Sequence, residues 1–195
     1  MTLRQQFLKL VYPIFNALSK KSSKTALIKR NEKEINPLIL FYSLSSTLNN
    51  GEELDFENFK GKSVLIVNTA SDCGYTAQYD ELEKLYQLNI ENLVVIAFPA
   101  NDFKEQEKGT DDEIASFCKL NYGVSFHIMK KTEVVGSHQN EIFKWLSNEQ
   151  NNGWCNQQPV WNFSKYLINK NGMLTCFYGP SISPLSEEII NEIKK

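Results

Sequence analysis

Two short apolar runs organise the centre of the chain. Residues 64–67 and 93–98 are rich in Val and Ile and show no polar alternation. Runs of this length and composition are typical of strands that are buried on both faces of a sheet. Between them, Tyr79, Leu82 and Leu85 recur at helical spacing. The pattern therefore predicts two buried strands separated by a helix over 78–88.

Further elements are predicted on either side of this centre. The pattern indicates strands at 41–44 and 126–129, a turn at 49–51 with extended residues up to Phe56, and helices at 141–146 and 186–193. Thr110 or Asp111 can cap a helix that carries Ile114 and Cys118. A late hairpin pairs 166–168 with 174–177 through an Asn-Gly turn. Strands that alternate with helices and end in a hairpin predict a three-layer α/β fold.

The first 38 residues have a different character. Leu3, Phe7 and Leu10 begin a helical apolar pattern, and the first 31 residues contain seven Lys or Arg and no acidic residue. We therefore predict an N-terminal basic extension at 1–38 and one domain at 39–195. The extension resembles a mitochondrial presequence. The alternatives are a cytoplasmic protein with a basic tail, or a tail that contacts a membrane surface.

Composition excludes several classes of function. The chain is 42% hydrophobic and 23% charged with a net charge of −2, so it has no basic footprint for nucleic acid. Its four cysteines lie far apart without a C-x-x-C pair, and two histidines accompany them. This spacing argues against a structural zinc site and against a secreted disulfide framework. We expect no metal, no cofactor and a reducing compartment.

Cys73 stands at the junction of the first buried strand and the following helix. Unpaired backbone N–H groups and the positive end of the helix dipole can stabilise a thiolate at such a position. The alternative is a structural cysteine, which behaves as a small apolar side chain. Position alone leaves both interpretations open.

Three ordered blocks resolve this ambiguity. They are Asn68-Thr69-Ala70-Ser71-Asp72-Cys73-Gly74-Tyr75-Thr76, then Phe98-Pro99-Ala100-Asn101-Asp102-Phe103-Lys104-Glu105-Gln106-Glu107, then Trp161-Asn162-Phe163-Ser164-Lys165-Tyr166-Leu167. Together they resemble the glutathione peroxidase family over roughly residues 40–195. The resemblance implies a thioredoxin-like fold, with a central mixed sheet flanked by helices, and the reduction of hydrogen peroxide and organic or lipid hydroperoxides.

The resemblance also assigns roles to side chains. It makes Cys73 the peroxidatic nucleophile and Gln106, Trp161 and Asn162 its catalytic partners. A thiolate that attacks an O–O bond needs donors that stabilise negative charge without being able to take the proton of the thiol permanently. The two amides and the indole N–H are neutral donors of this kind.

Cys118 resembles the resolving cysteine of the cysteine-type, thioredoxin-dependent subgroup, and the match is closest to its fungal branch. The resemblance implies a Cys73–Cys118 disulfide that thioredoxin reduces, after local unwinding near Gly123. Cys155 and Cys176 match no family role, and we expect Cys176 to be a core residue. Larger relatives build a tetramer through an insertion that this chain lacks, so the resemblance predicts a monomer without a dedicated glutathione site.

Two positions depart from the family pattern close to the nucleophile. Ala100 stands where a third cysteine is often found. Asp72 replaces a lysine beside Cys73, and a neighbouring carboxylate should raise the pKa of the thiol. Three alternatives to a thioredoxin-dependent peroxidase stay open: a glutathione-dependent enzyme, a sensor that passes oxidation to a partner protein, and a binding module that has lost its chemistry.

Overall fold

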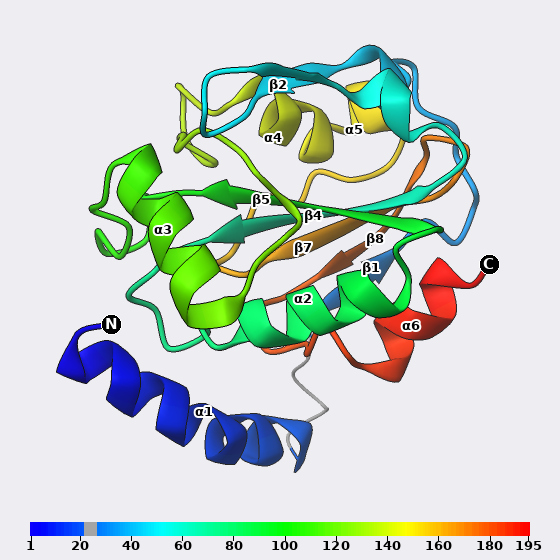
Figure 1. The fold of residues 1–195 in the computed structure, drawn as a ribbon. Helices are drawn as coiled ribbons and strands as arrows, with labels where there is room; N and C mark the ends of the chain where they lie inside the picture. Colours follow the sequence, from blue (N-terminus) through cyan, green and yellow to red (C-terminus); the bar gives the residue numbers. More distant parts are fainter. Residues whose placement is uncertain (22–26) are drawn as a thin grey trace.

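The computed structural model describes residues 1–21 and 27–195, with the side chains of 13–21 left out of the description. A six-stranded sheet lies at the centre in the order β1-β8-β7-β4-β5-β6 (Figure 1). The pairs β4–β5 and β5–β6 are parallel, and the pairs β1–β8, β8–β7 and β7–β4 are antiparallel, so the sheet is mixed. The strands are β1 (Ile28–Arg30), β4 (Ser63–Thr69), β5 (Leu93–Pro99), β6 (His127–Ile128), β7 (Lys165–Ile168) and β8 (Leu174–Tyr178).

Helices cover both faces of the sheet, which confirms the predicted three-layer arrangement. One face carries α2 (Gln78–Leu88), α3 (Asp111–Tyr122) and α6 (Glu187–Ile193) (Figure 1). The other face carries α4 (Glu141–Leu146), α5 (Glu149–Asn152) and the hairpin of β2 (Ser45–Thr47) and β3 (Glu53–Asp55). The helix at α5 was not predicted from the sequence.

The two central strands explain why the core forms on both faces. All seven residues of β4 and all seven of β5 are buried. Leu65 and Val67 pack with α2 and α3, while Val64 and Ile66 pack with the opposite layer, because successive side chains of a strand point to opposite faces. β4 ends at Thr69, and the chain leaves the sheet there and runs through a loop to α2, which begins at Gln78.

The predicted strand at 41–44 is wrong. Phe41–Ser43 forms a 3₁₀ helix, η2, and Phe56–Phe59 forms another, η3, where Phe56 was expected to be extended. The rings of Phe41 and Phe56 stack at 4.9 Å, and both are fully buried. The 3₁₀ turns bring the two rings together. The free energy gained from packing the buried rings outweighs the preference of the local sequence for an extended backbone.

The N-terminal segment enters the fold in two places, contrary to the expectation that it lies outside. Its predicted helix forms as α1 (Leu3–Lys21) and lies beside α2 and the C-terminal end of α3 (Figure 1). Strand β1 pairs with β8 as the edge of the main sheet. Two of its three residues are exposed, so no buried pattern marks it in the sequence.

Candidate active site

Hydrogen bonds fix the loop between β4 and α2 in the shape that carries Cys73. Thr76 Oγ1 accepts the Cys73 N–H at 2.9 Å and donates to the Ala70 carbonyl at 2.8 Å. Thr76 N–H donates in turn to the Cys73 carbonyl at 3.1 Å. The cysteine therefore sits in a tight turn between β4 and α2, as predicted.

A buried carboxylate ties this loop to the segment that contains Gln106. The Glu107 carboxylate accepts the backbone N–H and the hydroxyl of Ser71, each at 2.8 Å. The Asp72 N–H donates to the Gln106 carbonyl at 3.0 Å. Glu107 is fully buried, and burial raises the pKa of its carboxyl while the hydrogen bonds from Ser71 oppose the rise. Sequence reasoning did not select Glu107.

Donor groups from two parts of the chain lie around the Cys73 sulfur. The Tyr75 N–H donates to Sγ at 3.4 Å, and the donor groups of the Trp161 and Asn162 side chains lie close enough to the thiol to lower its pKa. Asn162 Nδ2 also donates to Gln106 Oε1 at 3.0 Å. The structure thus brings together all four residues that the sequence predicts, with Gln106 linked to the cysteine through Asn162.

The electrostatic balance at Cys73 follows from this arrangement. Burial raises the pKa of the thiol, the donors from Tyr75, Trp161 and Asn162 lower it, and the charge of Asp72 raises it. Burial prevails, so the pKa of the thiol stays above its ordinary value. The effect of Asp72 has the predicted direction. The donors favour the charged sulfur that forms when the thiol loses its proton.

The turn that carries Trp161 and Asn162 is held by a polar residue of the central sheet. Asn68 Nδ2 donates to the Trp161 carbonyl at 3.1 Å, and Asn68 Oδ1 accepts the Ser164 N–H at 3.1 Å. Phe163 adopts a φ of +67°, which is unusual for a residue other than glycine. Asn68 belongs to the first of the three blocks, but the sequence alone predicted no role for it. A buried amide in an otherwise apolar strand needs partners, and that need was the available signal.

Cys118 lies in the same core region, on a different element. Its helix α3 begins with a capping box between Thr110 and Glu113 and ends at Gly123, whose φ is +63°. Cys118 is fully buried next to Tyr79 of α2, and burial raises the pKa of its thiol to about 12. Every cysteine of the chain is free and buried, including Cys176 in the core as expected.

The surroundings of the site offer space beside Trp161. An open hollow of about 420 Å³ is lined by Tyr75, Trp161, Leu27, Val160 and Pro180, among others. Within residues 1–21 and 27–195 no cluster of His, Cys, Asp and Glu could hold a metal ion. The arrangement is thus a buried thiol with neutral donors and an adjoining hollow of mixed polarity.

The fold and this site define a class of protein. A cysteine at the end of a central strand, before a helix and under neutral hydrogen-bond donors, is the arrangement of a thiol-based oxidoreductase. A thiol:disulfide interchange protein of the thioredoxin family from Chlorobium tepidum aligns with a TM-score of 0.58 over 82% of this chain and 93% of its own, at 12% identity. This likeness supports the thioredoxin-like fold alone.

Closer similarities identify the family. The glutathione peroxidase family model matches residues 41–147. A glutathione peroxidase-like peroxiredoxin of Saccharomyces cerevisiae is 42% identical over 160 residues, which cover 79% of this chain and 98% of the yeast protein. The solved structure of Trgpx in its apo form aligns with a TM-score of 0.63 at 32% identity, over 81% of this chain and 97% of its own. The chain belongs to the glutathione peroxidase family and is a thiol-dependent peroxidase.

Proposed function

We propose that Cys73 is the peroxidatic residue of this enzyme. The hydrogen bond from the Tyr75 N–H to its sulfur and the nearby donor groups of Trp161 and Asn162 support the assignment. The Cys73 thiolate attacks one oxygen of a hydroperoxide, an S–O bond forms, and the O–O bond breaks. The alkoxide or hydroxide that leaves takes up a proton and departs as an alcohol or water, and Cys73 remains as a sulfenic acid.

The neighbouring side chains have separate tasks in this step. The Trp161 and Asn162 donors stabilise the thiolate as its proton leaves, and the same N–H groups can orient the peroxide and its leaving oxygen. The side-chain oxygen Oε1 of Gln106 accepts a hydrogen bond from Asn162 Nδ2 at 3.0 Å and so holds the Asn162 amide in place. Because none of these groups carries a charge, none competes permanently for the proton of the thiol.

A matched pair of substitutions tests the nucleophile. Cys73 and Cys155 are both free, and each is only 1% exposed. We expect Cys73→Ser to abolish peroxide consumption, whereas Cys155→Ser keeps it within about twofold of wild type. Appreciable turnover by the Cys73→Ser protein would assign the chemistry to another cysteine.

We further propose that Cys118 resolves the sulfenic acid and that thioredoxin reduces the product. The Cys118 thiol attacks the Cys73 sulfur, an S–S bond forms, and the hydroxyl leaves as water. A dithiol then reduces the disulfide through a mixed disulfide. Both sulfurs belong to the same apolar cluster, but Cys118 is on a helix, so the last turns of α3 must open before the bond can form.

Parallel assays separate the competing reductants. Peroxide consumption is measured with thioredoxin and its reductase, and with glutathione and its reductase, under otherwise equal conditions. The proposal predicts turnover with thioredoxin that Cys118→Ser abolishes. A preference for glutathione would favour the glutathione-dependent alternative. Slow turnover with both, together with a trapped mixed disulfide to another protein, would favour a peroxide sensor.

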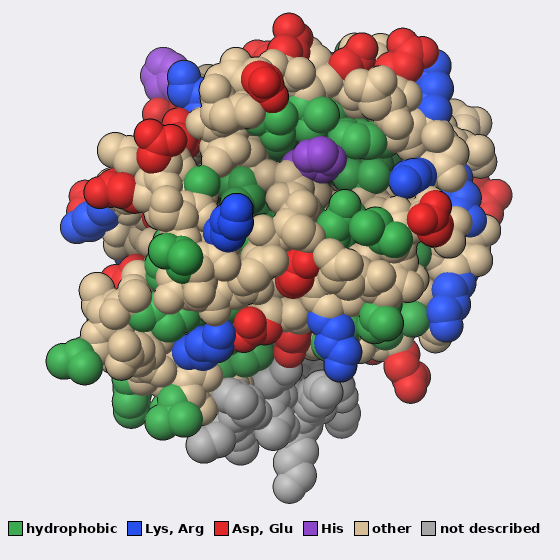
Figure 2. All heavy atoms as spheres, viewed as in Figure 1, with side chains coloured by type: hydrophobic (Ala, Val, Ile, Leu, Met, Phe, Trp, Pro, Cys, Tyr) green, Lys and Arg blue, Asp and Glu red, His purple; other side chains and the backbone are tan. Residues whose placement is uncertain are grey.

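The N-terminal segment supports a proposal about location. On α1, Leu3, Phe7 and Leu10 are 85%, 63% and 76% exposed, and Figure 2 shows apolar side chains that project where this helix lies. Because residues 1–31 are basic and contain no acidic residue, we propose that residues 1–38 direct mitochondrial import and that this face contacts a lipid surface. Within the described residues, no helix is long and apolar enough to cross a membrane.

A fluorescent protein fused behind residues 1–38 tests the location. We expect it to co-purify with mitochondria, and a diffuse cytosolic signal would overturn the assignment. Flotation with liposomes tests the lipid contact, with Phe7→Asp as the variant that should weaken it. We also propose a monomer, for which light scattering during gel filtration should return a mass near 22.4 kDa.

A further inference from the structure

Helix α1 lies across the loop that carries Cys73. Arg4 Nη1 forms an ion pair with Asp72 Oδ2 at 2.7 Å, and Gln5 Nε2 donates to the Ser71 carbonyl at 3.0 Å. Both partners directly precede the cysteine in the sequence. The first turns of α1 therefore contact the active-site loop itself, through polar side chains.

One turn further along, Lys9 reaches the C-terminal end of α3. Its Nζ donates to the Asn121 carbonyl at 3.1 Å and lies 4.2 Å from the centroid of the Tyr122 ring. The same ammonium pairs with Asp80 of α2 at 3.0 Å. Asn121 and Tyr122 form the last turn of α3, directly before Gly123. A cation at this end of a helix is stabilised by the helix dipole and by the unpaired carbonyls of the last turn.

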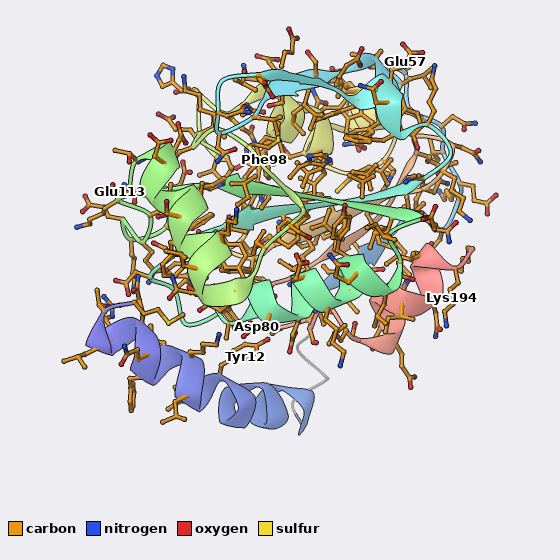
Figure 3. The ribbon with its side chains drawn as sticks, viewed as in Figure 1. Tyr12, Glu57, Asp80, Phe98, Glu113 and Lys194 are labelled. Carbon is orange, nitrogen blue, oxygen red and sulfur yellow. The ribbon has the colours of Figure 1, made fainter. Side chains whose placement is uncertain are left out.

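Tyr12 completes the contact between α1 and the body. Its ring is 7% exposed, and its hydroxyl donates to Glu81 Oε2 of α2 at 3.3 Å. Figure 3 shows Tyr12 and Asp80 on the facing sides of α1 and α2. Since Leu3, Phe7 and Leu10 are exposed, much of the contact surface of this part of α1 is polar. Partly exposed ion pairs stabilise such a contact only weakly, so the helix can detach.

We infer that α1 acts as a latch: it restrains α3, the helix that carries Cys118. Lys9 is the positioning residue of this latch. The inference rests on the proposed role of Cys118. Formation of the disulfide joins the Cys73 sulfenic acid to the Cys118 thiol and releases water, and it requires the last turns of α3 to open. While Lys9 holds the Asn121 carbonyl and the Tyr122 ring, that opening is opposed. The sulfenic acid then persists longer, and release of α1 shortens its lifetime.

Rapid mixing of the full-length reduced protein with hydrogen peroxide tests the latch. Trp161 lies beside Cys73, so its fluorescence can report oxidation and resolution as two successive phases. We expect Lys9→Met to speed the second phase by about fivefold, which is the effect of losing a cation at a helix end together with its aromatic contact. Lys9→Arg should restore most of the restraint. The first phase should be unchanged, because Lys9 does not touch the thiol.

The control variant is Lys144→Met, which removes a half-buried lysine paired with Glu141 on the opposite layer. It should leave both phases unchanged. Trapping with dimedone should show less sulfenic acid in Lys9→Met than in wild type at equal times. A second phase at the wild-type rate in Lys9→Met, with the Cys73–Cys118 disulfide still formed, would overturn the latch and leave the proposed function intact. Absence of that disulfide in every variant would overturn both.

Discussion

Replacement of Glu107 perturbs the site without touching the reacting atoms. Its buried carboxylate accepts both the backbone N–H and the hydroxyl of Ser71, and thereby ties the loop of Cys73 to the segment of Gln106. Glu107→Ala leaves both Ser71 donors without their partner. Glu107→Gln is the matched control, because its amide oxygen can accept the N–H while its NH₂ donates to the hydroxyl oxygen.

The magnitude follows from the two lost contacts. Hydrogen bonds to a charged group contribute about 1.5–3 kcal/mol each, so both together contribute about 3–6 kcal/mol. Removal of a buried charge offsets part of this, since burial raises the pKa of Glu107. We therefore expect Glu107→Ala to lower the free energy of unfolding by about 3 kcal/mol, and Glu107→Gln by less than about 1 kcal/mol.

Equilibrium unfolding in urea, followed by far-ultraviolet circular dichroism, measures these differences in the free energy of unfolding. Peroxide consumption reports whether the loop that carries Cys73 keeps its position. Loss of the tether should lower kcat/KM of Glu107→Ala by roughly tenfold, because small displacements at a reacting centre are costly. Because folding raises the pKa of the Glu107 carboxyl, its protonation stabilises the fold fully at pH values below its pKa in the unfolded chain. This stability is lost as pH rises through its pKa in the folded protein. Wild type should therefore gain stability relative to Glu107→Gln as pH falls toward about 4.5. Equal stabilities of Glu107→Ala and wild type would refute the reasoning.

Three further substitutions have defined outcomes. Asp72→Asn should lower the pKa of Cys73, since the Asp72 charge raises it, and an unchanged pH profile of thiol alkylation would contradict this. Burial lowers the pKa of Lys165 to about 7, so the unfolded chain binds more protons above that pH. The unfolding free energy of wild type should therefore rise relative to Lys165→Met between about pH 7 and about pH 8.5, and parallel curves would refute it. At Gly153 a Cβ would lie 2.7 Å from a backbone carbonyl oxygen, whereas the space at Gly51 is open. Gly153→Ala should therefore destabilise the fold by about 2 kcal/mol more than Gly51→Ala, and equal unfolding midpoints of the two variants would contradict this.

The sequence predicted the fold best where local pattern and tertiary environment agree. β4, β5 and α2 were found because continuous apolar runs and helical spacing mark elements buried against both layers. η2 was missed because stacking between Phe41 and Phe56 depends on residues that lie far apart along the chain. β1 was missed because an exposed edge strand is defined by its pairing with β8 and not by burial.

The candidate site divides in the same way. Cys73 and its partners Gln106, Trp161 and Asn162 were predicted because they lie in recognisable blocks. Glu107 carries no such sign of its role, because a carboxylate in a loop normally faces water, and only the fold shows its Ser71 partners. The docking of α1 was also out of reach, since it depends on polar contacts of an amphipathic helix with apolar residues facing outward.

The central claim is that Cys73 and Cys118 react with each other during turnover. Reduced protein is treated with one equivalent of hydrogen peroxide, free thiols are blocked, and the disulfide-linked peptides are mapped by mass spectrometry. The account predicts a Cys73–Cys118 link that thioredoxin removes. In the Cys118→Ser protein this link is absent, and Cys73 instead forms a sulfenic acid that over-oxidises. A link from Cys73 to Cys155 or Cys176, with Cys118 still free, would contradict it.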